Sequence, residues 1–277
     1  MKKIGFIDYF LDEWHANNYP QWISEASEGK MVVSYAFGMI DAPNGLSNAE
    51  WSSNMGVKLL DTIEDVVEQS DYLIVLSPDH PEQHEKLSQI PLQSGKPTYI
   101  DKTFAPDRST SLRLFELAKQ HGTPMFSSSA LRFATEYGDI NREVITISSV
   151  GPGKFENYAI HQVEPIVSLM GTDINRVMWI GTPNSPALLI EFAGSRQAEI
   201  RHFGNGCPFA MTINDSTNST RLIKIESDFF ASFTKKLIHF FDSGIAKVDP
   251  AETIAIITIL EYGKIASQIP YQWVDLP

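Results

Sequence analysis

The chain has 277 residues, of which 43% are hydrophobic and 20% charged, and its formal net charge is −12. This composition is typical of a globular protein with one large domain or two ordinary ones. The acidic balance argues against nucleic acid or an anionic membrane as partner, because both need a basic surface. The sequence contains no run of about 18 apolar residues, so no membrane-spanning helix is predicted. The single cysteine, Cys207, excludes an intrachain disulfide and favours a cytoplasmic protein.

The first 130 residues alternate short apolar segments with helix-like ones. The expected strands are 3–8, 31–40, 57–60, 72–76, 97–100 and 124–127. The expected helices are 12–29, kinked or split at Pro20, then 62–69 with Asp61 as N-cap and Glu64 as capping-box partner, 81–94 and 107–121. Short buried strands that alternate with helices predict a doubly wound, Rossmann-type parallel sheet covered on both faces.

After a helix expected near 135–142, strands dominate the second half. They are expected at 144–150, 176–181, 187–192, 197–203, 210–214 and 221–225, with a hairpin turn at Gly194-Ser195. Consecutive strands favour a mainly antiparallel sheet. Two helices close the chain, the first at 229–242 with a core face of phenylalanines, the second after Asp249 as N-cap and Pro250. We therefore expect two domains, at 1–130 and 131–277, and we expect the last helix to pack back on the first domain.

In an open parallel sheet, ligands bind beyond the carboxyl ends of the strands. Lys102 directly follows a buried strand, where it could bind a substrate hydroxyl or exchange a proton with it. The alternative is a solvated surface lysine. His161 shares one helix face with Asn157 and Glu164 at i, i+4 and i+7 spacing and could relay a proton from an alcohol. The alternative is a capping or core histidine.

The other histidines give weaker signals. His80 and His84 have the spacing of metal ligands, but no third ligand is evident, so we expect a solvated helix end and no metal. His15, beside Asp12 and Glu13, sits where a glycine-rich turn would pass a phosphate, and it could instead cap the helix. Cys207 has no nearby base and is expected to be inert.

Five segments together resemble one known family. They are LIVLSPDH (73–80), GKPTYIDKT (95–103), SSSALRF (127–133), NYAIHQVE (157–164) and DSGIAKVDPAETIAIITILEYGKIASQ (242–268). Their order and spacing are similar to those of the glucose–fructose oxidoreductase, inositol 2-dehydrogenase and MocA (Gfo/Idh/MocA) family over nearly the whole chain. The resemblance implies a Rossmann domain followed by an α/β domain with an open, mainly antiparallel sheet.

The resemblance also implies an activity: hydride transfer between NAD or NADP and a sugar- or polyol-like alcohol or ketone. It implies Lys102, His161 and Glu164 as catalytic residues and Arg132 and Asn157 as substrate contacts. The cofactor contacts that it implies are Asp8, Phe10, Leu11, Ser77, Pro78, Asp79, His84, Asp101 and Lys102. Family members usually bury the open sheet against a second copy, which implies a homodimer.

The first strand–helix turn departs from that family. A G-x-G-x-x-G/A turn permits close approach of the backbone to a pyrophosphate, whereas residues 8–13 here are Asp-Tyr-Phe-Leu-Asp-Glu. Asp41 is the only acid near the end of the second strand that could hold a ribose. Three hypotheses follow: an oxidoreductase with an unusual cofactor pose, a non-catalytic sensor or regulatory protein that kept the fold, or a lyase or isomerase that uses Lys102 and His161 for proton transfer.

Overall fold

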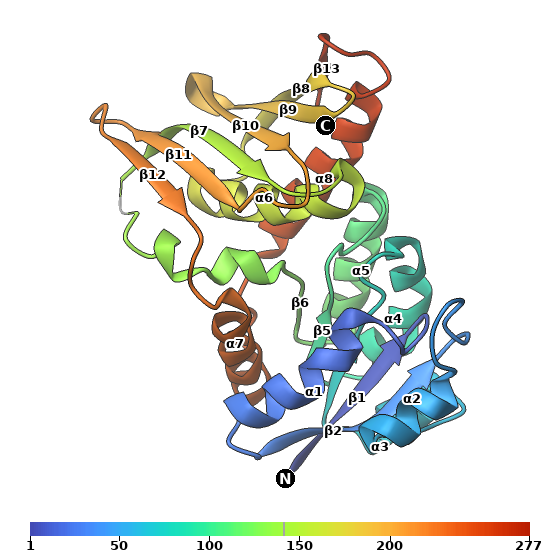
Figure 1. The fold of residues 1–277 in the computed structure, drawn as a ribbon. Coiled ribbons are helices and arrows are strands. Elements are labelled where there is room, and N and C mark those ends of the chain that lie inside the picture. The colour runs from blue at the N-terminus through green and yellow to red at the C-terminus, as the bar shows by residue number, and fades with distance from the viewer. Residues whose placement is uncertain (141) are drawn as a thin grey trace. The chain divides into compact units, whose positions relative to one another are not determined.

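The computed structural model describes residues 1–140 and 142–277, and it divides into two compact units. Unit 1 comprises Met1–Ser128 and Phe233–Pro250, and unit 2 comprises Ser129–Ser232 and Ala251–Pro277. Each unit has its own sheet with helices packed against it (Figure 1). The chain thus leaves unit 1 after one continuous stretch and returns later to add a second piece.

The sheet of unit 1 has six strands in the order β3-β2-β1-β4-β5-β6. Their bounds are β1 (Lys2–Asp8), β2 (Met31–Gly38), β3 (Lys58–Leu59), β4 (Tyr72–Val75), β5 (Thr98–Ile100) and β6 (Met125–Phe126). Every neighbouring pair is parallel. The strand order reverses between β1 and β4, which places a crevice beyond their carboxyl ends. The expected doubly wound sheet is confirmed.

The helices of unit 1 largely follow the sequence pattern. They are α1 (Trp14–Ala26), α2 (Asn48–Met55), α3 (Ile63–Gln69), α4 (His84–Gln93) after a 3₁₀ turn at Pro81–Gln83, and α5 (Arg108–Gln120). Pro20 does not split the helix, because α1 runs through it with Tyr19 and Ile23 buried on either side. One proline costs one backbone hydrogen bond, and this buried face offsets the loss.

Two helix starts also differ from expectation. The N-cap of α3 is Thr62 rather than Asp61, because the Thr62 hydroxyl accepts the Asp65 N–H at 3.1 Å. The helix α2 was not expected at all, although Ser47 and Glu50 form a full capping box at its start. That S-x-x-E pattern is visible in the sequence and is a known signal for a helix start.

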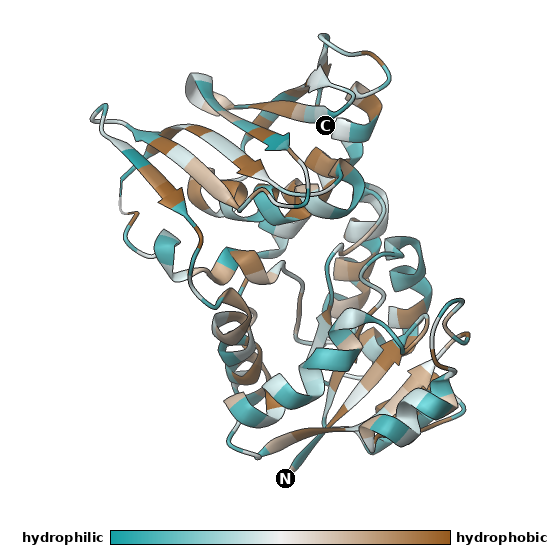
Figure 2. Cartoon of the chain, in the orientation of Figure 1, coloured by the Kyte–Doolittle hydropathy of each residue, from teal (hydrophilic) through white to brown (hydrophobic). Residues whose placement is uncertain are grey.

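Aromatic packing joins the late segment Phe233–Pro250 to the sheet of unit 1. The helix α7 (Phe229–Ser243) sends Phe233 to 5.3 Å from the Tyr99 ring, and Phe241 stacks 4.8 Å from Tyr72. Figure 2 shows the apolar character of α7 and β1 in brown. Each such ring pair contributes about 0.5–1.5 kcal/mol beyond its buried area. The expected phenylalanine core face of this helix is confirmed for Phe233, Phe240 and Phe241.

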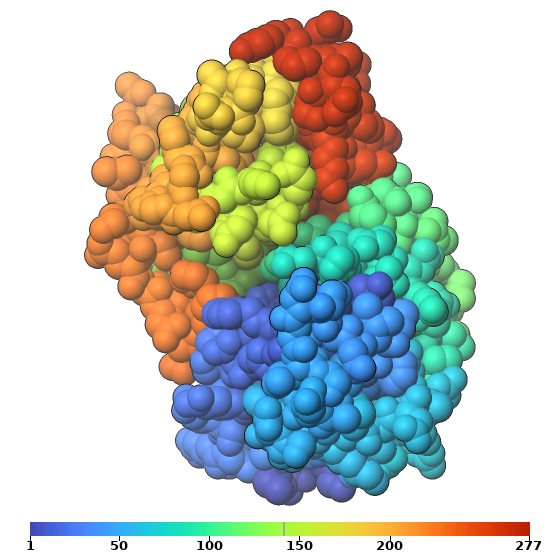
Figure 3. Space-filling model, turned by 45° about the vertical axis from the view of Figure 1, so that its right-hand side comes forward, coloured from blue at the N-terminus to red at the C-terminus, as the bar shows by residue number. Residues whose placement is uncertain are grey.

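Unit 2 is built on a seven-stranded sheet of order β12-β11-β7-β10-β9-β8-β13. The bounds are β7 (Val144–Gly151), β8 (Ile174–Thr182), β9 (Ser185–Phe192), β10 (Arg196–His202), β11 (Ala210–Asp215), β12 (Thr220–Lys224) and β13 (Trp273–Asp275). Only β7 and β10 pair in parallel, so the sheet is mainly antiparallel as expected. The strand β13 was not expected; the C-terminal residues, red in Figure 3, lie beside the yellow β8–β9 hairpin.

Two long helices of unit 2, α6 (Phe155–Met170) and α8 (Pro250–Ala266), contribute many buried apolar residues to its core. From Ala251 onward α8 is counted with unit 2, whereas most of α7 belongs to unit 1. The helix expected at 135–142 was wrong: the structure has short 3₁₀ turns at Ala130–Phe133 and Thr135–Tyr137, and residue 141 lies outside the described residues. The Glu136 carboxylate binds the N–H groups of Glu226 and Ser227 instead of supporting a local helix.

Candidate functional site

The carboxyl edge of the unit 1 sheet gathers most of the expected cofactor residues. Asp8 ends β1, Ser77 follows β4, and Asp101 and Lys102 follow β5. Because β1, β4 and β5 are adjacent and parallel, these residues share one edge. Ser77 has a left-handed backbone with φ of 89°, which sets the sharp turn into Pro78. The sequence therefore placed these residues correctly with respect to the sheet.

Lys102 is held against the turn that follows β4. Its Nζ donates to the Pro78 carbonyl at 3.2 Å and to the Asp79 carboxylate at 3.3 Å. The side chain is only 11% exposed, so it is not the solvated lysine of the alternative interpretation. A cation positioned at the ligand edge by a carbonyl and a carboxylate is suited to bind an oxygen atom of a small molecule.

Asp101 and His15 form a buried pair beside Lys102. The His15 Nδ1 contacts one carboxylate oxygen of Asp101, while Tyr99 donates to the other at 3.1 Å and Tyr19 at 3.3 Å. Burial lowers the pKa of His15, but the Asp101 charge and hydrogen bond outweigh it and the net pKa is raised. Burial likewise raises the pKa of Asp101, and the His15 charge outweighs it, so its net pKa is lowered. Each group therefore favours the charged form of the other.

The acids of the first turn serve the protein's own backbone. Glu13 is the N-cap of α1, and its carboxylate accepts the N–H groups of His15 and Ala16. Burial raises the pKa of Glu13 to about 7. Asp12 accepts the Leu46 N–H at 2.8 Å. These carboxylates occupy the helix start at which a dinucleotide-binding turn leaves its N–H groups for phosphate.

Other residues near the turn also make hydrogen bonds within the chain. Asp8 is buried and accepts the Tyr9 N–H at 2.6 Å, and desolvation raises its pKa well above the ordinary value. Leu11 is fully buried, and its N–H donates to the Asn48 side chain at 3.0 Å. Asp41, the candidate ribose ligand, caps α2 by accepting the Asn48 N–H at 2.8 Å.

Phe10 completes the expected first-turn contacts, and its ring lies 5.9 Å from that of His80. The turn thus presents buried apolar and acidic side chains rather than glycine backbone. Its N–H donors at Tyr9, Leu11, His15 and Ala16 all have acceptors within the chain. The residues present do not fit a dinucleotide whose pyrophosphate lies on the start of α1.

His84 has a structural role. It is fully buried, and its two ring nitrogens lie 3.0 Å from the Phe104 carbonyl and 2.7 Å from the Leu76 carbonyl. Burial lowers its pKa. The expectation of a solvated helix end was therefore wrong for His84, because the ring ties the end of β4 to the segment after β5. Within the described ranges, no group of three or more His, Cys, Asp or Glu side chains is placed to hold a metal ion.

Unit 2 brings together the other expected residues on α6 and the segment before it. The His161 Nδ1 lies 2.7 Å from the Ser129 hydroxyl, and the Ser129 N–H donates to Glu164 at 3.0 Å. Arg132 reaches Glu164 at 3.3 Å and also contacts Glu252 at the start of α8. These residues form one continuous polar chain, which we call the His161 chain: His161, Ser129, Glu164, Arg132 and Glu252. Asn157 lies one helical turn before His161 on α6.

The charge state of Glu164 suits proton exchange. Burial raises its pKa to about 7, although the Arg132 charge and the Ser129 N–H act in the opposite direction. A carboxyl group that titrates near neutrality can take up and release a proton under physiological conditions. Neither Ser129 nor Glu252 was expected from the sequence to have a catalytic or substrate role: Ser129 lies in the segment 128–132, which was a candidate only because it follows a strand, and Glu252 has the pattern of a helix-start residue.

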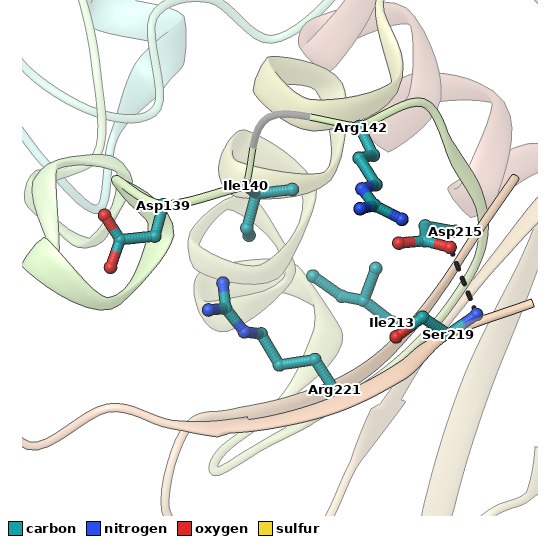
Figure 4. Close-up of a pocket in the computed structure, with 7 residues that line it drawn as sticks. All are labelled: Asp139, Ile140, Arg142, Ile213, Asp215, Ser219 and Arg221. Atoms are coloured by element: carbon teal, nitrogen blue, oxygen red, sulfur yellow. Dashed lines mark hydrogen bonds between the residues drawn. The ribbon is translucent and has the colours of Figure 1, made fainter. Parts of the chain in front are cut away.

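A surface pocket of unit 2 lies outside the His161 chain. It has a volume of about 320 Å³ and is lined by Asp139, Ile140, Arg142, Ile213, Asp215, Ser219 and Arg221. Figure 4 shows the Arg142 guanidinium directed toward Asp215. Two arginines and two aspartates balance each other in charge, and none of the expected site residues reaches this pocket.

No described helix has the length and apolar character that a bilayer crossing requires.

Comparisons with known proteins give structural matches only. No protein-family model matches the chain, and no curated protein matches it in sequence. A probable dehydrogenase from Thermotoga maritima superposes with a TM-score of 0.81 at 12% identity, covering 99% of this chain and 98% of that one. The scyllo-inositol dehydrogenase of Lactobacillus casei, solved with NAD(H) and scyllo-inositol, gives 0.78 at 15% identity, covering 99% and 98%.

A third similar structure is myo-inositol 2-dehydrogenase from Lactobacillus plantarum. It superposes with a TM-score of 0.76 at 13% identity, covering 100% of this chain and 99% of that one. The chain has the same two-unit fold as these dehydrogenases. The likeness extends over both units and confirms the fold that the sequence resemblance implied. At such low identity the likeness concerns the fold, and activity has to be argued from the residues.

Proposed function

We propose that the chain is an oxidoreductase acting on a hydroxyl or carbonyl group of a sugar- or polyol-like molecule, with a nicotinamide dinucleotide as its redox partner. The observation that carries the proposal is the His161 chain, in which Ser129 links the His161 imidazole, through its hydroxyl, to the Glu164 carboxyl group, through its N–H. Burial raises the pKa of that carboxyl group to about 7. Such an arrangement supports proton exchange with an alcohol. The polyol dehydrogenase of Lactobacillus casei, solved with NAD(H), supports the substrate class and the cofactor class.

Each candidate residue has a role in this proposal. Lys102 binds the reacting oxygen as a cation, and His161 takes the hydroxyl proton on oxidation and returns it on reduction. Ser129 fixes the orientation of the His161 ring through Nδ1. Glu164 positions Ser129 through its N–H. Asn157 and Arg132 are the proposed contacts for the other hydroxyl groups.

The proposed cofactor contacts lie on the β4 and β5 side of the unit 1 edge. They are Ser77, Pro78 and Asp79 in the turn after β4, and Asp101 and Lys102 after β5. Asp41 is committed to capping α2, so no acid is left after β2 to favour a ribose 2′-hydroxyl over a 2′-phosphate. We therefore leave NAD and NADP as equal candidates.

Two measurements test this function. Titration with NADH and with NADPH, followed by nicotinamide fluorescence, is expected to saturate at or below millimolar concentration. A panel of sugars and polyols with NAD⁺ or NADP⁺ is expected to give turnover that Lys102→Ala abolishes. Lys58→Ala is the matched control, because that lysine lies exposed on the edge strand β3. Failure of both nucleotides to bind would contradict the proposal.

A second candidate function is a small-molecule sensor without turnover, and a specific observation favours it. Glu13 occupies the start of α1, so the customary pyrophosphate site is filled by the chain itself. A sensor would show a thermal shift with a sugar or polyol and no product. A lyase or isomerase that uses Lys102 and His161 would instead form a rearranged or eliminated product without consuming a nicotinamide.

We also propose a homodimer through the seven-stranded sheet of unit 2. Along β7 the exposed residues Thr146 and Ser148 alternate with the buried residues Ile147 and Ser149, so one face of the strand points away from the core. Light scattering after size-exclusion chromatography is expected to give twice the chain mass of 31.0 kDa at micromolar concentration. A monomer mass would contradict it.

A further inference from the structure

Several N–H groups of the turn after β1 have acceptors within the chain. In a dinucleotide-binding fold, the N–H groups at the start of the first helix bind the ligand's pyrophosphate. Here the His15 N–H donates to one oxygen of Glu13 at 2.7 Å, and the Ala16 N–H donates to the other. One carboxylate therefore satisfies two of the donors that a phosphate would use.

The donors earlier in the turn are satisfied in the same way. The Tyr9 N–H binds Asp8 at 2.6 Å, and the Leu11 N–H binds the Asn48 side chain at 3.0 Å. A phosphate arriving at this turn would have to displace these side-chain acceptors one by one. Each exchange replaces an existing hydrogen bond, so the ligand gains little from it.

Packing and charge oppose a phosphate as well. A Cβ atom on Gly45 would lie 2.4 Å from the Asp12 carboxylate, which shows how closely the segment before α2 approaches the turn. Asp12 binds the Leu46 N–H in that segment, and Asp101 adds a buried negative charge compensated by His15. A pyrophosphate would therefore meet a closely packed segment and the Asp12 carboxylate at this turn.

We propose that the Glu13 carboxylate is an internal substitute for a ligand phosphate and closes the start of α1 to pyrophosphate groups. The inference takes its ligand from the proposed function, a nicotinamide dinucleotide, and states that this ligand binds without contact between its pyrophosphate and α1. Glu13 is a positioning residue for the turn, since it acts on the backbone rather than on a reacting atom.

The first experiment uses inorganic pyrophosphate as the probe, followed by isothermal titration. We expect the natural chain to show no saturation at millimolar pyrophosphate. Glu13→Ala frees two N–H donors and removes one acidic group, so this variant should bind pyrophosphate at least about tenfold more tightly than the natural chain. Glu64→Ala is the matched control, because Glu64 is an exposed acid in the first turn of α3. Equal affinity of the natural chain and Glu13→Ala would overturn the proposal.

A conservative variant guards against misfolding. Glu13→Gln keeps an oxygen acceptor for one N–H group and loses the charge, so its pyrophosphate affinity is expected between those of the natural chain and Glu13→Ala. Circular dichroism of both variants verifies that α1 is retained. Pyrophosphate binding by Glu13→Gln no tighter than by Glu64→Ala, with α1 intact, would count against the proposal.

The second experiment separates this inference from the proposed function. Hydrogen exchange is followed at the His15 and Ala16 amides with and without NADH. Binding of NADH with unchanged exchange at these amides supports both ideas. Binding with new protection there overturns the inference and leaves the function intact. Absence of NADH binding, combined with pyrophosphate binding gained in Glu13→Ala, supports the inference and contradicts the function.

Discussion

The first turn of unit 1 and the His161 chain of unit 2 use the same residue types in opposite ways. In the turn, Glu13 and Asp8 bind backbone N–H groups, and His15 binds Asp101 directly. In the His161 chain, the histidine binds a hydroxyl group, and the carboxyl group of Glu164 is shared between a backbone N–H and an arginine. Acids and histidines whose hydrogen bonds are used up in holding the backbone, as in the first turn, are therefore poor candidates for proton exchange with a ligand.

The largest expected effect comes from breaking the His161 chain. His161→Ala removes the imidazole that we propose exchanges the substrate proton, so kcat/KM should fall by about 10²–10⁴-fold in initial-rate measurements. His121→Ala is the control, because that histidine is exposed at the end of α5. Equal rates for the two variants would place the proton exchange elsewhere.

Breaking the buried pair of the first turn should chiefly affect stability. Asp101→Asn leaves a buried His15 without its counter-charge, and the free energy of unfolding should fall by about 3–5 kcal/mol in urea titrations. The double variant His15→Asn with Asp101→Asn should recover part of the loss, because the two residues are coupled. A loss below about 1 kcal/mol in Asp101→Asn would show that the pair is not a buried ion pair.

The pH dependence of stability, compared between variants, distinguishes the acids of the two regions. The pKa of Glu164 is raised from 4.5 to about 7, so the folded state holds its proton more tightly than the unfolded state. Stability from this group is complete below pH 4.5 and is lost as pH rises through 7, by up to about 3 kcal/mol. The slope of unfolding free energy against pH should be shallower in Glu164→Gln than in the natural chain.

Glu13 titrates in the same window, because burial raises its pKa to about 7 as well. A residual slope should therefore persist in Glu164→Gln and diminish further in the double variant with Glu13→Gln. An unchanged slope in Glu164→Gln would indicate that this carboxyl group stays ionised beside Arg132.

The smallest effect is expected from the helix cap alone. Glu13→Gln retains one acceptor at the start of α1, so the unfolding free energy should fall by about 1 kcal/mol, the usual cost of a weakened N-cap. Thermal unfolding followed by circular dichroism measures it. A loss as large as that of Asp101→Asn would mean that Glu13 supports the whole turn rather than α1 alone.

The fold was predictable because it depends on regular patterns. Apolar strands alternating with helices specify the parallel sheet of unit 1, and consecutive strands specify the antiparallel sheet of unit 2. The misses have local causes: Ser47 and Glu50 signal α2, but the helix is short, and β13 has three residues that are strand only through pairing with β8. The helix expected at 135–142 does not form, and Glu136 instead accepts hydrogen bonds from the N–H groups of Glu226 and Ser227, which lie far along the chain.

The site was predictable in part. The ends of β4 and β5 placed Ser77, Asp101 and Lys102, since strand ends follow directly from the pattern. The partners of His15 and His161 were not predictable, because Asp101 lies 86 residues from His15 and Ser129 lies 32 residues from His161. Contacts of that kind arise from the tertiary fold and leave no periodic signal in one sequence.

The two-piece make-up of unit 1 has a consequence for synthesis on the ribosome. Its first 128 residues emerge long before Phe233–Pro250, which supplies the rings that pack on Tyr72 and Tyr99. Until that segment appears, the nascent sheet exposes an apolar surface, and closing the intervening loop carries an entropy cost. We therefore expect chains truncated before residue 233 to aggregate or to be held by chaperones, whereas chains that extend past residue 250 can complete unit 1.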